Sequence, residues 1–196
     1  MTGTFHLARY LALDSQKSLA AECLALGGAS AGFYTPVVRG MHPMSVKMLC
    51  LGRHWNAVTY RYEATRTDVD GLPVPPLPVN LIDLARDVAS AAGFTMSPDI
   101  CIVNWYTAAS KMGLHQDKDE SPESVARGVP VVSVSLGDTA IFRVGGLKRR
   151  IRSRRSTSSQ AMRLCSAALR DSGTMASRES SRPRARPTWA SKDVSV

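Results

Sequence analysis

Two stretches of the chain place hydrophobic residues on one face every three or four positions, which is the spacing of a helix. The first follows Asp14 or Ser15, either of which can cap it, and ends at the glycine pair 27–28. The second runs from Asn80, its expected N-cap, to Gly93. Both segments are predicted to be amphipathic helices.

Elsewhere hydrophobic and polar residues alternate over short runs, which is the period of a β-strand. The proline-rich segment 71–78 is predicted to be a loop, because proline cannot donate a ladder hydrogen bond. Short strands separated by glycine turns are typical of an antiparallel sandwich or jelly roll. The predicted strands cover residues 5–13, 99–106, 130–137 and 139–146, with strand-like alternation over 44–64.

The composition fits one folded domain in a reducing compartment. The chain has 196 residues, of which 44% are hydrophobic, so it can bury a core. No apolar run approaches the roughly 18 residues of a membrane span, and the N-terminus lacks the basic segment and cleavage site of a signal peptide. Cys23, Cys50, Cys101 and Cys165 form no C-x-x-C pair, so we expect a cytoplasmic protein without membrane contact.

The net charge of +9 is concentrated at the C-terminal end. Residues 151–196 contain ten Lys and Arg residues against three Asp and Glu residues, and 11 of these 46 positions are serine. Neither the helical nor the strand period continues beyond Arg150. We therefore predict a folded domain over residues 1–150 and a disordered basic tail over 151–196, which contacts DNA or RNA without sequence preference.

One short motif carries candidate metal chemistry. His115 and Asp117 are two positions apart, and on an extended strand such residues point to the same side. An imidazole nitrogen and a carboxylate oxygen can then bind one metal ion, as in the two-histidine, one-carboxylate site of non-haem iron oxygenases. A pair this short is also typical of a surface histidine beside acidic residues, so the surrounding sequence decides its meaning.

That surrounding sequence resembles the AlkB family of Fe(II)- and 2-oxoglutarate-dependent dioxygenases. The blocks N-x-Y, L-H-Q-D-K-D-E, S-V-S-L-G and A-I-F-x-x-G-G-L-K-R occur over residues 104–149 in the family's order and at its spacing. A weaker resemblance extends upstream through M-S-V-x-M, Trp55 and Tyr62. The resemblance implies a double-stranded β-helix (jelly roll), mainly β with flanking helices.

The resemblance covers about residues 1–150. It implies a nucleotide-recognition lid at about 44–70 and a catalytic core from about residue 99. Within the core, it makes His115 and Asp117 the first two iron ligands. The residues that it assigns to 2-oxoglutarate binding are Asn104 and Tyr106.

The resemblance also assigns residues to the substrate. Trp55 and Tyr62 match the aromatic residues of the lid, and a flipped base needs such a stacking surface. Asp119 matches an acid that meets the exocyclic nitrogen of the damaged base, where a carboxylate favours the positive charge of a methylated base. Arg149 and Met48 complete the substrate set. Simpler interpretations are sheet packing for the aromatic residues and surface charge for Asp119 and Arg149.

The implied activity is oxidative demethylation. The family uses Fe(II), 2-oxoglutarate and O₂ to remove N-alkyl groups from nucleobases, and releases succinate, CO₂ and formaldehyde. The implied partner is alkylated DNA or RNA, and the implied state is a monomer.

The sequence departs from the family in its last part. The family has a second iron histidine in a Y-H-G segment and two downstream arginines that bind 2-oxoglutarate. The four histidines here are His6, His42, His54 and His115, so none follows His115. We therefore expect the third iron ligand to be absent and the jelly roll to be incomplete at its C-terminal end.

A shift of reading frame after Arg150 explains this departure. Read one base out of register, the codons of residues 160–180 permit G-D-A-L-V-L-G-G-A-S-R-L-G-Y-H-G-I-A-R-I, close to the family's next block. Some residues of this reading are fixed by the genetic code. The third base of the Met175 codon and the first two bases of the Ala176 codon together encode only glycine. We predict that one base is missing near codon 150 and that the histidine is encoded across the codons of Thr174 and Met175.

Two alternative functions stand beside this one. A chain without the third ligand can be a catalytically inactive remnant that binds nucleic acid through Trp55, Tyr62 and the basic tail. The other alternative is a related dioxygenase that acts on a protein or a small molecule. The K-D-E segment at residues 118–120 and the aromatic residues of the lid favour nucleobases instead. Succinate formation separates an enzyme from a binding remnant.

Overall fold

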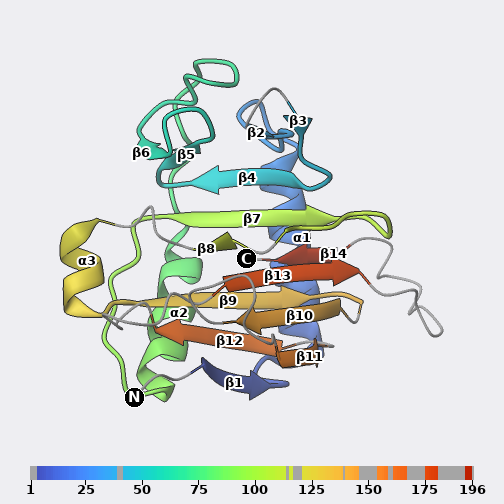
Figure 1. Cartoon of the computed structure of the whole chain (residues 1–196), viewed down its shortest axis with the longest axis vertical. Helices are drawn as coiled ribbons and strands as arrows, with labels where there is room; N and C mark the ends of the chain where they lie inside the picture. Colours follow the sequence, from blue (N-terminus) through green and yellow to red (C-terminus); the bar gives the residue numbers. More distant parts are fainter. Residues whose placement is uncertain are drawn as a thin grey trace.

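The computed structural model describes residues 4–38, 42–113, 115–116, 121–138, 140–145, 154–158, 161–166, 175–180 and 193–195. Within these ranges the chain forms two larger sheets, two long helices and two small hairpins (Figure 1). No helix in the same ranges is long and apolar enough to cross a membrane.

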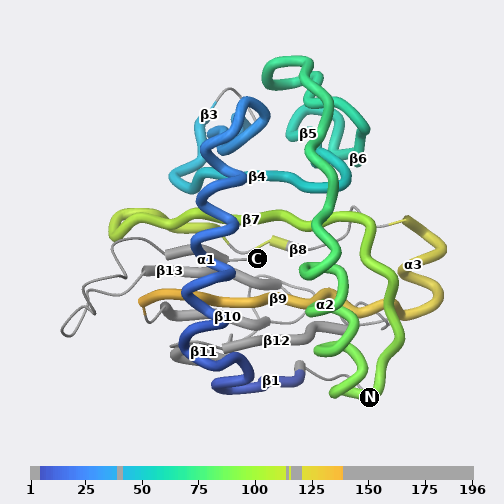
Figure 2. The backbone as a smooth tube through the Cα atoms, turned by 180° about the vertical axis from the view of Figure 1, so that it is seen from behind, coloured from blue at the N-terminus to red at the C-terminus, as the bar shows by residue number. Residues whose placement is uncertain are grey.

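The larger sheet has six antiparallel strands in the order β1-β12-β9-β14-β7-β4. Helices α1 (Leu13–Gly27) and α2 (Val79–Ala91) run across one face of it (Figure 2). The bounds of its strands are β1 Thr4–Ala8, β12 Ala161–Ser166, β9 Pro130–Leu136, β14 Asp193–Ser195, β7 Cys101–Tyr106 and β4 Lys47–Leu51.

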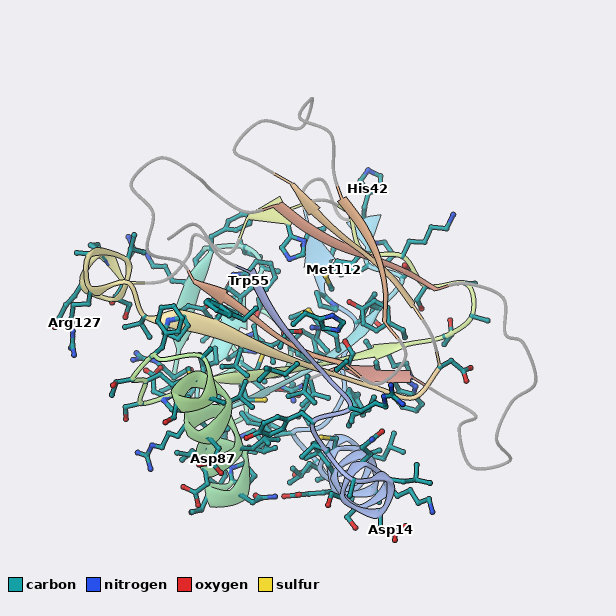
Figure 3. All side chains as sticks on the ribbon, turned by 90° about the horizontal axis from the view of Figure 1, so that it is seen from below. Asp14, His42, Trp55, Asp87, Met112 and Arg127 are labelled. Carbon is teal, nitrogen blue, oxygen red and sulfur yellow. The ribbon has the colours of Figure 1, made fainter. Side chains whose placement is uncertain are left out.

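The smaller sheet has four antiparallel strands in the order β11-β10-β13-β8. It lies on the side of the larger sheet away from the two long helices (Figure 3). Two hairpins, β2 with β3 and β5 with β6, stand beyond β4 (Figure 1). The bounds are β11 Arg154–Ser158, β10 Ala140–Gly145, β13 Met175–Ser180, β8 His115–Gln116, β2 Val37–Val38, β3 His42–Pro43, β5 His54–Asn56 and β6 Arg61–Glu63.

The alternation of side chains on β4 and β7 determines which face meets the helices. Leu49 and Leu51 of β4 are fully buried in the main core together with Val103 of β7. Cys23 of α1 and Val88 of α2 belong to the same core. The intervening residues of both strands therefore face the smaller sheet, since side chains alternate across a strand.

The ends predicted for both helices are confirmed, but the predicted caps are wrong. Helix α1 begins ahead of Asp14, whose carboxylate instead accepts a hydrogen bond from Lys17 at 3.0 Å in the first turn. Helix α2 begins ahead of Asn80, whose amide donates to Glu22 of α1 at 2.6 Å. A contact between the helices thus replaces the local cap, and residue type alone does not reveal such a contact.

The predicted strands at 99–106, 130–137 and 139–146 are confirmed as β7, β9 and β10. The first strand is shorter than predicted, because Arg9 has a φ of 55° and turns the chain toward α1. The alternating segment 44–64 forms three strands separated by turns. The mainly β architecture with flanking helices is that of a jelly roll.

The C-terminal segment differs from its prediction. Four strands, β11 to β14, lie between residues 154 and 195, where a tail without strands was predicted. Strand β14 pairs with both β7 and β9, and β13 pairs with both β10 and β8. Ladder hydrogen bonds use main-chain groups, so a strand position between two neighbours accepts sequences that lack the strand period.

The short helix α3 (Pro122–Arg127) was not predicted, although its local signals are present. Ser121 accepts a hydrogen bond from the Ser124 N–H at 3.1 Å, which is an N-cap. Gly128 ends the helix with a φ of 70°, which favours glycine. These signals flank only six residues, too few for a periodic pattern.

Candidate active site

The face of β4 and β7 that meets the smaller sheet gathers the predicted site residues. Met48 and Cys50 occupy this face of β4, and Asn104 and Tyr106 occupy it on β7. Met48 is the cross-strand partner of Asn104, so their side chains lie on the same side of the sheet. The sequence spacing predicts that Asn104 and Tyr106 share a face, and their positions on the continuous strand β7 agree with it.

Asn104 presents a buried polar atom to this space. Its Oδ1 atom has no hydrogen-bond partner among the described residues. An unpaired buried polar group costs about 1–3 kcal/mol, so such groups are normally satisfied. The amide also carries an NH₂ group, and a rotation of the terminal group presents either a donor or an acceptor. A polar ligand between the sheets fits this side chain.

Tyr106 places a hydroxyl beside that amide position. The Tyr106 side chain is buried, and its hydroxyl donates to the sulfur of Met112 at 3.6 Å. A thioether is a weak acceptor, so a carboxylate ligand is a stronger partner for the same hydroxyl. Met112 belongs to the loop between β7 and β8, and its side chain points inward in Figure 3.

His115 begins β8 in the smaller sheet. Its Nδ1 atom lies 2.9 Å from the carbonyl oxygen of Gly113, and because a carbonyl only accepts, Nδ1 carries the proton of this bond. Histidines that bind metals usually donate one ring N–H in this way, which directs the other nitrogen to the metal. The donor set of the described residues therefore fits an iron ligand at this position.

A serine network fixes the loop that leads to His115. Ser110 is buried, donates to the Ser45 carbonyl oxygen at 2.5 Å and accepts from the Thr107 N–H at 2.9 Å. The Lys111 N–H donates to Ser45 Oγ at 2.9 Å. The loop that leads to β8 is thereby tied to the segment that enters β4.

Trp55 and Tyr62 meet on the hairpin of β5 and β6, which we call the lid hairpin. They are direct cross-strand partners and therefore share a face. Trp55 is partly buried and packs against the cluster of Tyr34, Met48 and Cys50. The predicted aromatic residues and Met48 thus come together at one end of the space between the sheets.

A buried histidine–aspartate hydrogen bond fixes the other face of the lid hairpin. His54 Nε2 lies 2.5 Å from Asp68 Oδ1, and the two side chains are 0% and 8% exposed. The second carboxylate oxygen of Asp68 accepts the Ala57 N–H at 2.9 Å. The His54 ring also lies against Tyr34, with ring centroids 5.2 Å apart. Sequence reasoning missed this pair, since no local pattern joins residues 54 and 68.

Asn56 closes the turn of the lid hairpin. Its side-chain oxygen accepts the N–H groups of Val58 and Thr59 at 2.8 and 2.9 Å. Its NH₂ group donates to both carboxylate oxygens of Glu63 at 3.1 Å. The turn and the second strand are thus held by a single buried amide.

Hydrogen bonds received by Glu63 stabilise its charged form. The donors are Thr67 Oγ1 at 2.5 Å, Asn56 and Thr59 Oγ1 at 3.0 Å. These hydrogen bonds hold the pKa of the Glu63 carboxyl below its usual 4.5, and the bond from Thr67 has the largest effect.

We expect the lid hairpin to loosen in acid. Because the folded pKa of Glu63 is lowered, its stabilising contribution is complete above about pH 4.5 and is lost as the pH falls through the folded value. Amide protection factors of Val58 and Thr59, measured by NMR, should fall over that range. Glu63→Gln should remove the pH dependence, and constant protection in the unsubstituted chain would contradict the expectation.

Arg66 anchors the base of the lid to the segment after α1. Its buried guanidinium donates to the Gly32 carbonyl oxygen at 2.8 Å and pairs with Asp70 at 2.9 Å. The guanidinium also lies over the Tyr34 ring, 5.0 Å from the centroid. The lid hairpin is therefore attached at both ends through buried polar side chains.

Comparison with known proteins places this site in a family. The model of the 2OG-Fe(II) oxygenase superfamily matches residues 3–171. An alpha-ketoglutarate-dependent dioxygenase AlkB homolog of Caulobacter vibrioides is 39% identical over 159 residues, which cover 79% of this chain and 68% of the relative. This chain belongs to the AlkB family.

Other AlkB-family proteins are similar over a smaller share of their length. The DNA N(6)-methyladenine demethylase ALKBH1C of Arabidopsis thaliana is 38% identical over 159 residues, and the match covers 73% of this chain and 35% of that relative. This chain thus spans about a third of the length of that relative. The solved structure of OsALKBH1 matches with a TM-score of 0.88 and 30% identity, and covers 100% of this chain and 95% of its own.

The fold also extends beyond nucleic-acid enzymes. A prolyl-4-hydroxylase structure from Pseudomonas putida matches with a TM-score of 0.53 at 13% identity, which indicates a shared fold alone.

The predicted site residues Asp117, Asp119 and Arg149 lie outside the described residues. Within the described part of the chain, no three His, Cys, Asp or Glu side chains are grouped to hold a metal ion.

Proposed function

We propose that this chain is the catalytic domain of an AlkB-family dioxygenase that removes N-alkyl groups from nucleobases in DNA or RNA. The observation that carries the proposal is the convergence of Asn104, Tyr106 and Met48 under the lid residues Trp55 and Tyr62. The names of the Arabidopsis relatives support methylated adenine as the substrate class.

The proposed cofactor and cosubstrate are Fe(II) and 2-oxoglutarate. His115 and Asp117 would hold the iron, while the Asn104 amide and the Tyr106 hydroxyl donate to 2-oxoglutarate. When bound, the iron would let O₂ act as the oxidant: one oxygen atom would convert 2-oxoglutarate to succinate and CO₂, and the other would hydroxylate the N-methyl carbon, which then leaves as formaldehyde. The buried face around Met48 excludes water from the reacting groups.

The lid residues receive the flipped base in this proposal. Trp55 and Tyr62 provide its stacking surface, and Asp119 accepts from its exocyclic nitrogen. Arg149 would supply a basic residue near the same substrate. We further propose a monomer that acts in the cytoplasm, which the unpaired thiols of Cys23, Cys50 and Cys101 support.

For the last 46 residues we infer a shifted reading frame that begins near Arg150. In the natural frame the segment would supply the Y-H-G histidine and the missing arginines, and so complete the jelly roll.

Replacement of Asn104 by alanine tests the 2-oxoglutarate site. A hydrogen bond to a charged group contributes about 1.5–3 kcal/mol, so the Kd of 2-oxoglutarate should rise about tenfold or more. Titration calorimetry with Mn(II) in place of iron measures this change. Asn80→Ala, which changes an asparagine on α2 outside the site, should leave the Kd unchanged. Equal affinities for all three proteins would contradict the assignment of Asn104.

A second candidate function is nucleic-acid binding without catalysis. It is favoured by one observation, the lack of any histidine after His115. Oligonucleotide binding without succinate formation, in a chain whose DNA sequence confirms the present frame, would support this candidate. Succinate and formaldehyde in equal amounts would support the demethylase.

A further inference from the structure

The turn between β5 and β6 exposes apolar side chains at the tip of the lid hairpin. Val58 is 73% exposed and Tyr60 is 38% exposed, whereas Asn56 and Ala57 just before them are buried. Exposed apolar groups that gather on one surface can mark a binding site, so the ligand must be argued from the geometry and charge around this turn. The lid hairpin stands beyond β4 at one end of the molecule (Figure 1), so this tip is open to a long ligand.

The backbone holds Tyr60 in an unusual conformation. Its φ is 57°, in the left-handed region that glycine and asparagine adopt readily and bulky residues do not. The Tyr60 N–H donates to the Asn56 carbonyl oxygen at 2.9 Å, and the Asn56 side chain binds the preceding N–H groups. The sequence thus keeps an aromatic side chain where glycine or asparagine fits the turn better, and strained residues of this kind cluster at binding sites.

The Tyr60 ring continues the aromatic surface of the lid. It meets the Trp55 ring edge-on, with centroids 5.7 Å apart and an interplanar angle of 76°. Trp55 reaches inward to Met48, while Tyr60 lies on the solvent side of the same contact. One base stacked at Trp55 therefore leaves the next base of a single strand within reach of Tyr60.

The charges around the turn favour the same ligand. Arg61 follows Tyr60 directly and is exposed, so its guanidinium is available to a phosphate group. The nearby carboxylates are engaged, since Glu63 accepts from Asn56, Thr59 and Thr67. An aromatic face beside an exposed cation is the usual arrangement of a single-strand binding surface.

We propose that Tyr60 stacks on the nucleobase adjacent to the methylated one, so that the lid binds at least two nucleotides of a single strand. The proposal rests on the nucleobase substrate of the proposed function. It deepens that function, because it makes affinity depend on the flanking nucleotide as well as on the flipped base.

Binding assays with ligands of two lengths test this proposal. The probes are a fluorescent single-stranded heptanucleotide with one central N-methylated adenine and the corresponding methylated nucleoside monophosphate. Tyr60→Asn removes the ring and suits the left-handed turn, so it should fold normally. Tyr10→Asn is the matched control, because Tyr10 has a similar exposure of 40% and closely follows β1, which lies at the end of the molecule opposite the lid hairpin (Figure 1).

Tyr60→Asn should weaken heptanucleotide binding about tenfold, as expected for the loss of one stacked base, and should leave mononucleotide binding within about twofold. Tyr60→Phe should retain both affinities. If Tyr60→Asn binds the heptanucleotide as tightly as the unsubstituted chain, the role of Tyr60 is overturned while the proposed function stands. If the unsubstituted chain binds neither probe, the proposed function fails and the role of Tyr60 fails with it.

Discussion

Restoring the alternate reading frame after codon 150 is expected to raise Fe(II) affinity by more than about 100-fold. The loss of a residue that only hydrogen-bonds to a metal ligand already lowers metal affinity by about 10–100-fold, and a direct ligand contributes more. The chain as it stands offers His115 and Asp117 but no later histidine. Two protein ligands cannot complete the three-ligand face of this class of iron site.

The register of the smaller sheet gives this expectation a structural basis. Ala176 of β13 lies opposite His115, and Met175 lies opposite Gln116. The codons of Thr174 and Met175 encode the histidine in the alternate frame. The segment that would carry the missing ligand therefore already runs beside β8, because ladder hydrogen bonds use main-chain groups whatever the side chains are.

Two measurements check the frame. The first is the DNA sequence across codons 145–180, where one additional base near codon 150 is expected. The second is anaerobic Fe(II) titration of both proteins, followed by formaldehyde release from a methylated oligonucleotide. His115→Ala in the restored chain is the control and should abolish the gain. A restored chain that binds iron no better than the present one would show that the frame hypothesis is wrong.

Replacement of Asp68 by alanine is expected to destabilise the fold by about 3 kcal/mol, because removing one partner of a buried pair leaves the other uncompensated. The substitution leaves His54 and the Ala57 N–H without their acceptor. For a chain of this length the melting temperature should fall by roughly 6–12 °C. Thermal unfolding followed by circular dichroism measures the change.

Asp99→Ala is the matched control for that prediction. Asp99 pairs with Arg53 at 3.7 Å, but its side chain is 73% exposed, so its loss should cost less than about 1 kcal/mol. The double variant His54→Ala with Asp68→Ala should be less destabilised than the two single changes added together, because the pair acts as a unit. Equal losses for Asp68→Ala and Asp99→Ala would contradict a structural role of the buried pair.

Hydrophobic periodicity determined the long elements of this protein. Helices α1 and α2 and strands β7, β9 and β10 carry a strong pattern over six or more residues, which local sequence is sufficient to specify. The same period of two predicts that Asn104 and Tyr106 share a face, because both lie on the continuous strand β7. Family motifs indicated the site because they are contiguous in the chain.

The tertiary structure alone decided how those elements are joined. The Asn80 contact with Glu22, the His54 pair with Asp68 and the place of β14 between β7 and β9 each link segments that are far apart in sequence or unmarked by any pattern. Such contacts depend on where the packed elements leave a donor facing an acceptor. The sequence by itself determined which faces are buried and predicted which residues carry the chemistry, whereas packing between distant segments determined how the lid hairpin is held.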